Sequence, residues 1–379
     1  MTSSSSHRTR AALVWLTSLC AICAASTSAA TAIAEETAAA TPASAATPAS
    51  AATPAPAPPV MANAYNTWVT ALAFSPDGQT LATAGGQTLL YRPGDVKLWD
   101  PQTGALKASY AGHNTVVTAL AFSPDGQTLA TAGYDGTLKL WNVADGKEKA
   151  SLPAHQHWIM ALAFSPDAQT LATASEDTTA KLWNITATPP AEKMTLKGHT
   201  GAVTSVVFSA DGQAIATGSG DKTAMLWNPA DGAMTKKFEG HGDTVSAVAF
   251  VLDGKTLATG SYDRTVKLWN IAEGKETAAL SGHHNWISAA RVSPDGKTLA
   301  TASHDRTVKL WNLESKQEAG TLGGFKSSVW AVAFAPSGQL LATGSHSDSL
   351  KLWKNGWVEA LPPAPAKPAD ATASASVSK

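Results

Sequence analysis

Cysteine is almost missing from this chain of 379 residues. The two cysteines, Cys20 and Cys23, lie together in an apolar stretch near the N-terminus. Their CxxC spacing can indicate a redox or metal motif, but a position inside an apolar leader makes that interpretation the weaker one. If the leader is removed, the mature protein has no thiol and no disulfide, so its stability must come from packing alone.

An excess of charge of either sign is also lacking. The chain has 28 Lys and Arg residues against 29 Asp and Glu residues, a net charge of −1. A leader that contains Arg8 and Arg10 but no acidic residue would leave 26 basic and 29 acidic residues, or −3. The basic residues are dispersed, which argues against the electrostatic footprint of a nucleic-acid-binding protein.

Long hydrophobic runs are absent except near the N-terminus. Residues 1–34 are predicted to form a signal peptide, in which Arg8 and Arg10 precede an apolar core and Ala32-Ile33-Ala34 fits a cleavage site. The core is shorter than the ~20 residues that span a bilayer. We therefore expect an exported protein, periplasmic or extracellular, with no membrane association after cleavage. An uncleaved N-terminal membrane anchor is the alternative.

Two segments have too few large apolar residues to form a core. Residues 35–64 are rich in Ala, Pro and Thr, and residues 362–379 are rich in Ala and Pro. Such compositions cannot offset the entropy lost on folding. Both are predicted to be disordered, the first as a linker and the second as a tail.

Residues 65–361 contain an internal repeat. Its marker is a tryptophan that recurs at steps of 42, 42, 44, 42, 42 and 42 residues: Trp99, Trp141, Trp183, Trp227, Trp269, Trp311 and Trp353. One unit of this size cannot bury a core alone, but neighbouring units can share one. The units must therefore stack against each other.

Each repeat divides into four strand-like pieces. In the second repeat they are residues 117–122, 128–132, 137–141 and 147–152, separated by Gly, Pro, Asn and Asp residues. The first three are apolar on both faces, and the fourth carries Lys and Glu as an outer edge strand does. Four-stranded antiparallel sheets arranged radially, with charged outer edges, form a β-propeller.

With its GH, SPDG, LATGS and D-x-T-x-KLW motifs at fixed offsets, the repeat resembles that of the WD40 family, in an exported member of bacterial type. The resemblance implies an all-β, seven-bladed propeller of four-stranded antiparallel blades. The closing blade would take its outer strand from residues 357–361, which align with other fourth strands; residues near Val60 are the alternative.

Five repeats share a His, a Thr and an Asp at 28, ten and six residues before the marker Trp. In the resembling family these positions form a hydrogen-bonded chain within each blade. The four-residue sets are His113, Thr131, Asp135 and Trp141; His155, Thr173, Asp177 and Trp183; His199, Thr217, Asp221 and Trp227; His241, Thr259, Asp263 and Trp269; and His283, Thr301, Asp305 and Trp311.

These residue types also occur in catalytic triads, but five copies of one set favour a structural role, because an active site is needed once. The first and last repeats depart from the pattern, with Tyr65 and Phe325 at the His position and Ser347 at the Asp position. We predict no catalytic residue, no metal and no cofactor. Four further histidines, His157, His284, His304 and His346, are expected to be exposed to solvent.

A partner should bind where the copies differ, on the face that carries the His and Asp loops. The resemblance places the variable positions around the channel on this face. The candidates are residue types that dominate interface energy, together with one histidine: Trp68, Tyr134, Trp158, Tyr262, Arg264, Trp286, His304, Arg306 and Trp330.

The favoured function is a non-enzymatic scaffold, expected to be monomeric, that binds another protein. Carbohydrate or cell-wall binding through the aromatic side chains is the alternative, because tryptophan rings also stack on sugars. A propeller enzyme is the third possibility, although the chain has no phosphate loop and no zinc motif.

Overall fold

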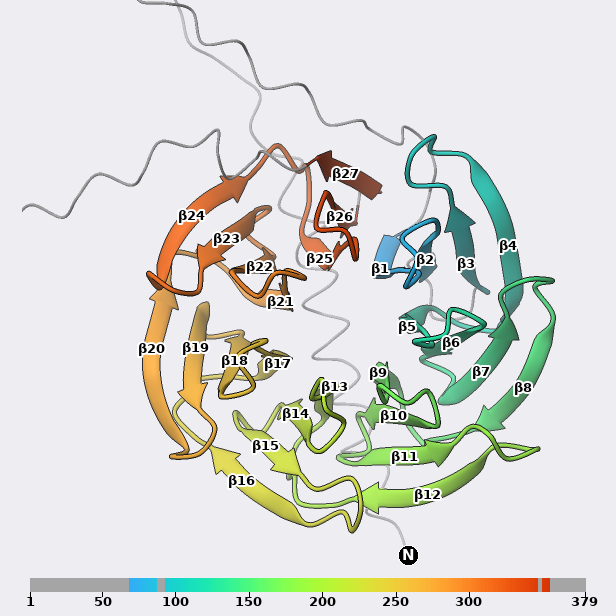
Figure 1. Ribbon diagram of the computed structural model, residues 1–379, viewed down its shortest axis with the longest axis horizontal. Coiled ribbons are helices and arrows are strands. Elements are labelled where there is room, and N and C mark those ends of the chain that lie inside the picture. Colours follow the sequence, from blue (N-terminus) through green and yellow to red (C-terminus); the bar gives the residue numbers. More distant parts are fainter. Residues whose placement is uncertain (1–67, 87–92, 347–349, 355–379) are drawn as a thin grey trace, which may run out of the picture. The chain divides into compact units, whose positions relative to one another are not determined.

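Seven antiparallel β-sheets surround a central channel in the computed structural model, which describes residues 68–86, 93–346 and 350–354 (Figure 1). The arrangement is a seven-bladed β-propeller, as the period of the repeat predicted. Blades are numbered 1 to 7 in chain order. Every secondary-structure element in the described residues is a strand.

The strands of blades 1 to 3 are β1 (Trp68–Phe74), β2 (Leu81–Gly86), β3 (Gly94–Trp99), β4 (Leu106–His113), β5 (Val117–Phe122), β6 (Thr128–Gly133), β7 (Thr137–Asn142), β8 (Glu148–Pro153), β9 (Ile159–Phe164), β10 (Thr170–Ser175), β11 (Ala180–Asn184) and β12 (Ala191–Leu196). Those of blades 4 and 5 are β13 (Val203–Phe208), β14 (Ile215–Ser219), β15 (Ala224–Trp227), β16 (Met234–Phe238), β17 (Val245–Phe250), β18 (Thr256–Ser261), β19 (Thr265–Asn270) and β20 (Lys275–Ser281).

Blade 6 contains β21 (Ile287–Val292), β22 (Thr298–Ser303), β23 (Val308–Asn312) and β24 (Gln317–Leu322). Blade 7 has three described strands, β25 (Val329–Phe334), β26 (Leu340–Ser345) and β27 (Leu350–Lys354). Both segments predicted to supply its fourth strand, residues 357–361 or those near Val60, lie outside the described residues.

The strands run from the channel outward in sequence order, so β5 is innermost and β8 outermost in blade 2 (Figure 1). The four strands predicted in that repeat agree with β5–β8 to within one residue at each end. Its burial follows the predicted gradient: β6 is buried throughout, whereas β8 alternates between exposed and partly buried residues.

The core lies between blades. Leu129 of β6 packs with Ala82 and Ala84 of blade 1, whereas Ala130 and Ala132 of the same strand pack against blade 3. Because successive side chains of a strand point to opposite faces, the LATA sequence gives each blade one large and one small face. Large side chains of one blade therefore fit against the alanines of the next, which permits close sheet packing.

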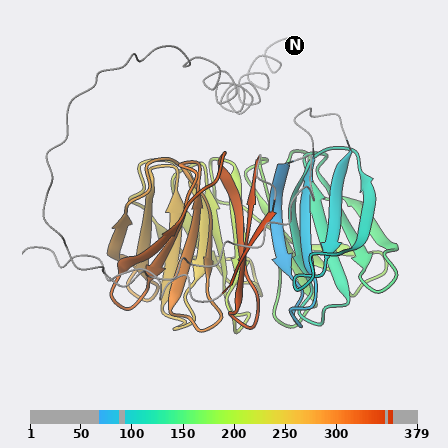
Figure 2. The same ribbon diagram turned by 90° about the horizontal axis from the view of Figure 1, so that it is seen from above.

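The turns lie at two ends of the propeller, seen from the side in Figure 2. The inner strand of each blade begins after the loop that carries the recurrent His, and it ends at the SPDG turn or its equivalent. We call the end with the His loops the His face and the other end the SPDG face.

Candidate interaction face around the channel

The recurrent polar residues meet in the five central blades. In blade 2, Trp141 Nε1 donates a hydrogen bond to Thr131 Oγ1 at 2.8 Å, and Thr131 Oγ1 is 2.8 Å from His113 Nε2. His113 Nδ1 lies 3.3 Å from Asp135 Oδ2. Since the hydroxyl accepts from the indole, it donates to the imidazole, which leaves the Nδ1–H to donate to the carboxylate.

The same chain recurs in blades 3 to 6. There the distance between His Nδ1 and Asp Oδ2 is 2.7 or 2.8 Å, for His155–Asp177, His199–Asp221, His241–Asp263 and His283–Asp305. The five imidazoles are at most 2% exposed. Every hydroxyl that a triad would use as a nucleophile is already bonded on both sides, so the geometry favours a structural role.

The Asp carboxylates of these hydrogen-bonded series are held in the ionised form. Burial alone would raise the pKa of Asp177, but hydrogen bonds from His155 and from the Thr179 hydroxyl and amide outweigh it and lower the pKa to about 2. The same balance lowers the pKa of Asp135, Asp221, Asp263 and Asp305. In blade 4, burial also lowers the pKa of His199, against the opposing effect of Asp221.

Blades 1 and 7 have only part of this series of hydrogen bonds. Trp99 and Trp353 still donate to Thr83 and Thr343, at 2.8 and 3.0 Å. Phe325 takes the place of His in blade 7, where its ring lies 5.8 Å from that of Trp353. Tyr65 and Ser347 lie outside the described residues.

The partner candidates form stacks across blade boundaries on the His face. The rings of Tyr134 in blade 2 and Trp158 in blade 3 stack at 4.1 Å between centroids. Tyr262 in blade 5 and Trp286 in blade 6 repeat the arrangement at 4.8 Å. In each pair the Tyr precedes the recurrent Asp, and the Trp precedes the inner strand of the next blade. Burial raises the pKa of both tyrosines, that of Tyr134 to about 12.

A second run of rings extends the stack of blades 5 and 6. His304 lies 5.5 Å from Trp286 and 4.6 Å from Trp330, measured between ring centroids. The rings of Tyr262, Trp286, His304 and Trp330 therefore form one row, which we call the aromatic row. Arg264 and Arg306 are exposed in the turns beside it. Trp68 lies apart from this row, with its ring 4.5 Å from that of His346.

The prediction that His304 is exposed was wrong. Its side chain is packed between two tryptophans, and the residue is only 9% exposed. Burial lowers its pKa to about 4. His346 is half-buried, whereas His157 and His284 are exposed as expected.

Two buried nitrogens in this region have no hydrogen-bond partner within the described part of the chain. They are His304 Nε2 and Trp330 Nε1. A buried polar atom left unpaired costs about 1–3 kcal/mol. Such atoms are uncommon in native structures, and a bound water, an ion or local strain can account for them.

A ring of hydroxyls around the channel was missed by the sequence analysis. In each inner strand the pairing register shifts at one residue, which forms a β-bulge; in five blades this residue is Thr or Ser. Its hydroxyl donates to a carbonyl of the next blade: Thr70 to Val117, Thr118 to Ile159, Thr204 to Val245, Ser246 to Ile287, and Ser288 to Val329.

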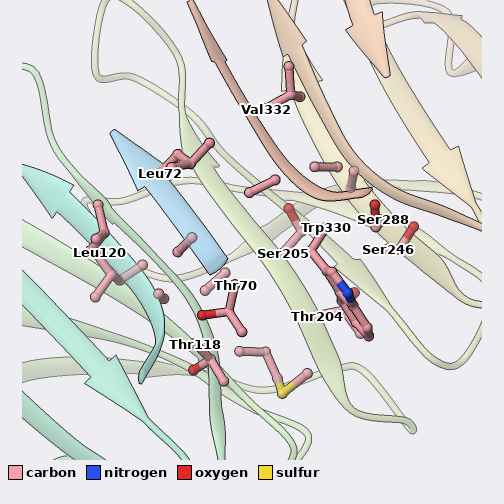
Figure 3. Close-up of a pocket in the computed structure, with 18 of the residues that line it drawn as sticks. Thr70, Leu72, Thr118, Leu120, Thr204, Ser205, Ser246, Ser288, Trp330 and Val332 are labelled. Atoms are coloured by element: carbon pink, nitrogen blue, oxygen red, sulfur yellow. The ribbon is translucent and has the colours of Figure 1, made fainter. Parts of the chain in front are cut away.

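The same position is Met160 in blade 3 and Trp330 in blade 7, so those two boundaries have no such hydroxyl. Figure 3 shows several of the hydroxyls and Trp330 around the central cavity. The sequence signal was the recurrence of Thr or Ser at one position, but its partner in the next blade could not be inferred from one repeat.

Neither a metal-binding cluster nor a membrane-spanning helix occurs in the part of the chain that the structure describes. It brings together no group of three or more His, Cys, Asp or Glu side chains suited to a metal ion. It also contains no helix of the length and apolar character needed to cross a bilayer.

Comparison with known proteins agrees with the repeat. The family model described as "WD domain, G-beta repeat" matches seven segments: residues 61–100, 104–142, 146–184, 191–228, 232–270, 274–312 and 316–354. No curated protein matched the chain.

Proposed function

Because this chain belongs to the WD40-repeat family, we propose that it is a non-enzymatic scaffold that binds a partner protein through the aromatic row of its His face. WD40 propellers typically serve as protein-interaction scaffolds and are generally not enzymes. The feature of this protein that bears on partner choice is the aromatic row beside its central channel.

The observation that carries the proposal is the aromatic row itself. It joins three blades through side chains at positions that vary among the repeats, while the recurrent His, Thr, Asp and Trp are occupied in the hydrogen-bonded chains. Two exposed arginines flank it, and Trp, Tyr and Arg supply most of the energy at protein interfaces.

The stacking also favours protein over sugar. Tyr134 and Trp158 stack on each other, as do Tyr262 and Trp286, with interplanar angles of 25° and 15°. One face of each ring is therefore already covered. Only the opposite face of each ring could stack on a sugar, whereas a protein interface can also use ring edges and the neighbouring arginines.

The proposal includes the place where the protein acts. The predicted signal peptide supports export, and the Ala/Pro-rich residues 35–64 would then separate the cleavage site from the propeller. The partner should belong to the same exported compartment.

The test is capture of proteins from the exported fraction by the immobilised full chain. Trp286→Ala, and separately the pair Arg264→Ala and Arg306→Ala, should weaken binding of the captured protein by at least about tenfold, since interface hot spots are worth ~2 kcal/mol or more. The arginines are exposed, so their replacement should leave the melting temperature unchanged.

Lys222→Ala is the matched control. Lys222 is exposed at the equivalent turn position in blade 4 and has the same positive φ as Arg264, 71° against 74°, but it has no aromatic neighbour in that turn. Equal binding by all variants would contradict the proposal. Binding to polysaccharide alone on a glycan array would replace it with the carbohydrate alternative.

A further inference from the structure

A hollow opens on the SPDG face, opposite the aromatic row. It is a cavity of about 450 Å³ between blades 4, 5 and 6, and its apolar lining includes Phe208, Phe250, Leu252, Ile271 and Val292. This volume falls within the range of small-molecule sites.

The hollow lies where the repeats depart from their common sequence. The inner strand ends in Phe in six blades, at Phe74, Phe122, Phe164, Phe208, Phe250 and Phe334. Blade 6 has Val292 at this position, and the shorter side chain leaves space beside Phe208 and Phe250. The hollow is therefore open where the other blades place a phenyl ring.

The turn of blade 5 is altered beside the same space. Where most repeats have Ser-Pro, this turn has Val251-Leu252. Leu252 lies against the turn at Gly296 of blade 6, yet it remains 55% exposed. An exposed leucine next to an apolar hollow is the composition expected of a ligand site.

A lone cation completes the lining. The residue before the terminal Phe is Ala or Val in six blades, but Arg291 in blade 6. Arg291 lines both this hollow and the central channel. Its Nη1 donates to the carbonyl of Ala290 at 2.8 Å, and no carboxylate in the described residues forms an ion pair with it. A guanidinium has five N–H donors and stays charged, so most of its donors remain for a ligand.

An acidic residue marks the opposite side. Asp211 of blade 4 also lines the hollow, and its Oδ1 accepts hydrogen bonds from the Ser209 hydroxyl and the Gln213 amide. These bonds lower the pKa of Asp211, which stays ionised. A bound anion is therefore directed towards Arg291 and away from blade 4.

We propose that this hollow binds a small apolar carboxylate, an arylalkanoic or short aliphatic acid, with its hydrocarbon part in the space beside Val292 and its carboxylate on Arg291. A guanidinium pairs with a carboxylate through two parallel hydrogen bonds, which gives the interaction both strength and direction. The hollow lies at the opposite face from the aromatic row, although Arg291 and Trp330 both line the central channel, and it adds a ligand to the proposed scaffold.

The test uses 3-phenylpropionate as the probe and isothermal titration with the full chain. The uncharged 3-phenylpropanamide has nearly the same shape and should bind at least about tenfold more weakly, because it cannot form the charged pair. Arg291→Ala should lower the affinity for the acid by a similar factor and remove its preference over the amide.

Val292→Phe should abolish binding by filling the hollow. Both substitutions restore the residue that most other blades carry, so neither should disturb folding. Lys222→Ala, at an exposed position on the His face, should leave the affinity unchanged. The proposal is overturned if the unaltered protein gives no saturable binding at millimolar probe, if acid and amide bind equally, or if Val292→Phe binds as well as the unaltered protein.

Discussion

The histidines of this protein show how far one residue type can differ within a repeated fold. Five have hydrogen-bond partners on both ring nitrogens, a hydroxyl on one side and a carboxylate on the other. His304 has two tryptophan neighbours instead, and its Nε2 has no partner in the described residues. A charge on His304 is therefore much less favourable in the fold than in water.

This environment predicts a pH dependence of stability. Burial lowers the pKa of His304 from its usual 6.5 to about 4, so between these values the unfolded chain binds a proton that the folded chain does not. Stability should fall as the pH decreases from 6.5 to 4, by up to ~1.4 kcal/mol per pH unit for this group. His304→Phe keeps an aromatic ring but cannot titrate, so it should reduce this slope in urea-unfolding experiments.

His284→Phe provides the control, since His284 is exposed on the same face. An unchanged slope in His304→Phe would show that the ring is not buried as described. The carboxylates titrate in a different window: with a pKa lowered to about 2, Asp177 loses its stabilising effect only as the pH falls from about 4 towards 2.

The sequence predicted the contacts of residues that recur in every central repeat, but it did not predict the contacts of residues that differ between repeats. Fixed offsets of 28, ten and six residues were enough to group the His, Thr, Asp and Trp that the structure brings within hydrogen-bonding distance. The burial of His304 depends on Trp286 and on Trp330 from the next blade. One repeat read alone contains no sign of that contact.

Among the elements, the inner strands do more than line the channel. Each has a β-bulge near its start, and a bulge redirects the side chain of its extra residue. In five blades that side chain is a hydroxyl directed to a carbonyl of the neighbouring blade. The blades are thus joined by polar contacts as well as by the apolar core between them.

Removing one of these hydroxyls should measure how much its hydrogen bond between blades contributes to the free energy of unfolding. Ser246 Oγ lies 2.5 Å from the carbonyl oxygen of Ile287 in the next blade. Ser246→Ala should lower the free energy of unfolding by ~1 kcal/mol, the usual net value of a hydrogen bond. The pair with Ser288→Ala should lose about twice as much in urea unfolding, since the two bonds join different boundaries.

Ser281→Ala, at an exposed position on outer strand β20, is the matched control and should change stability by less than ~0.5 kcal/mol. If Ser246→Ala is no less stable than this control, the hydroxyl ring contributes nothing.

The sequence predicted the strands well because turn residues bound them, but it did not predict the bulges. A bulge is a property of pairing between strands, and the pattern of a single strand does not show it.

At the scale of the whole molecule, the ring closes between blades 7 and 1. Val69, Leu72 and Trp99 of blade 1 share a core with Ala342 and Leu352 of blade 7. Blade 7 has three described strands, and both segments predicted to supply a fourth lie outside the described residues. A test of whether a terminal segment stabilises the propeller should therefore be directed at the boundary between blades 7 and 1.

Deletion of residues 357–379 should lower the melting temperature by several degrees if residues 357–361 supply the outer strand, since the edge of β27 would lose its pairing. Deletion of residues 56–64 should then have little effect. The opposite result would assign the strand to the N-terminal segment, which is possible because the first family match begins at residue 61. Thermal unfolding followed by circular dichroism would distinguish the two.

The period alone was sufficient to predict the number of blades, because seven marker tryptophans require seven units. It did not predict the hollow on the SPDG face. Val292 is an ordinary residue for a strand end, and its effect appears only when Phe208 and Phe250 of two other blades are placed beside it.

The hydroxyl ring has two gaps, at Met160 and at Trp330, and they divide the propeller into two groups of blades. Blades 4 to 7 are joined in series by hydroxyls, as are blades 1 to 3. A propeller stretched by mechanical force should therefore separate first along the seam between β9 and β13 or the seam between β25 and β1. Tethered at its two ends, the molecule would come apart as two multi-blade pieces before any single sheet is lost.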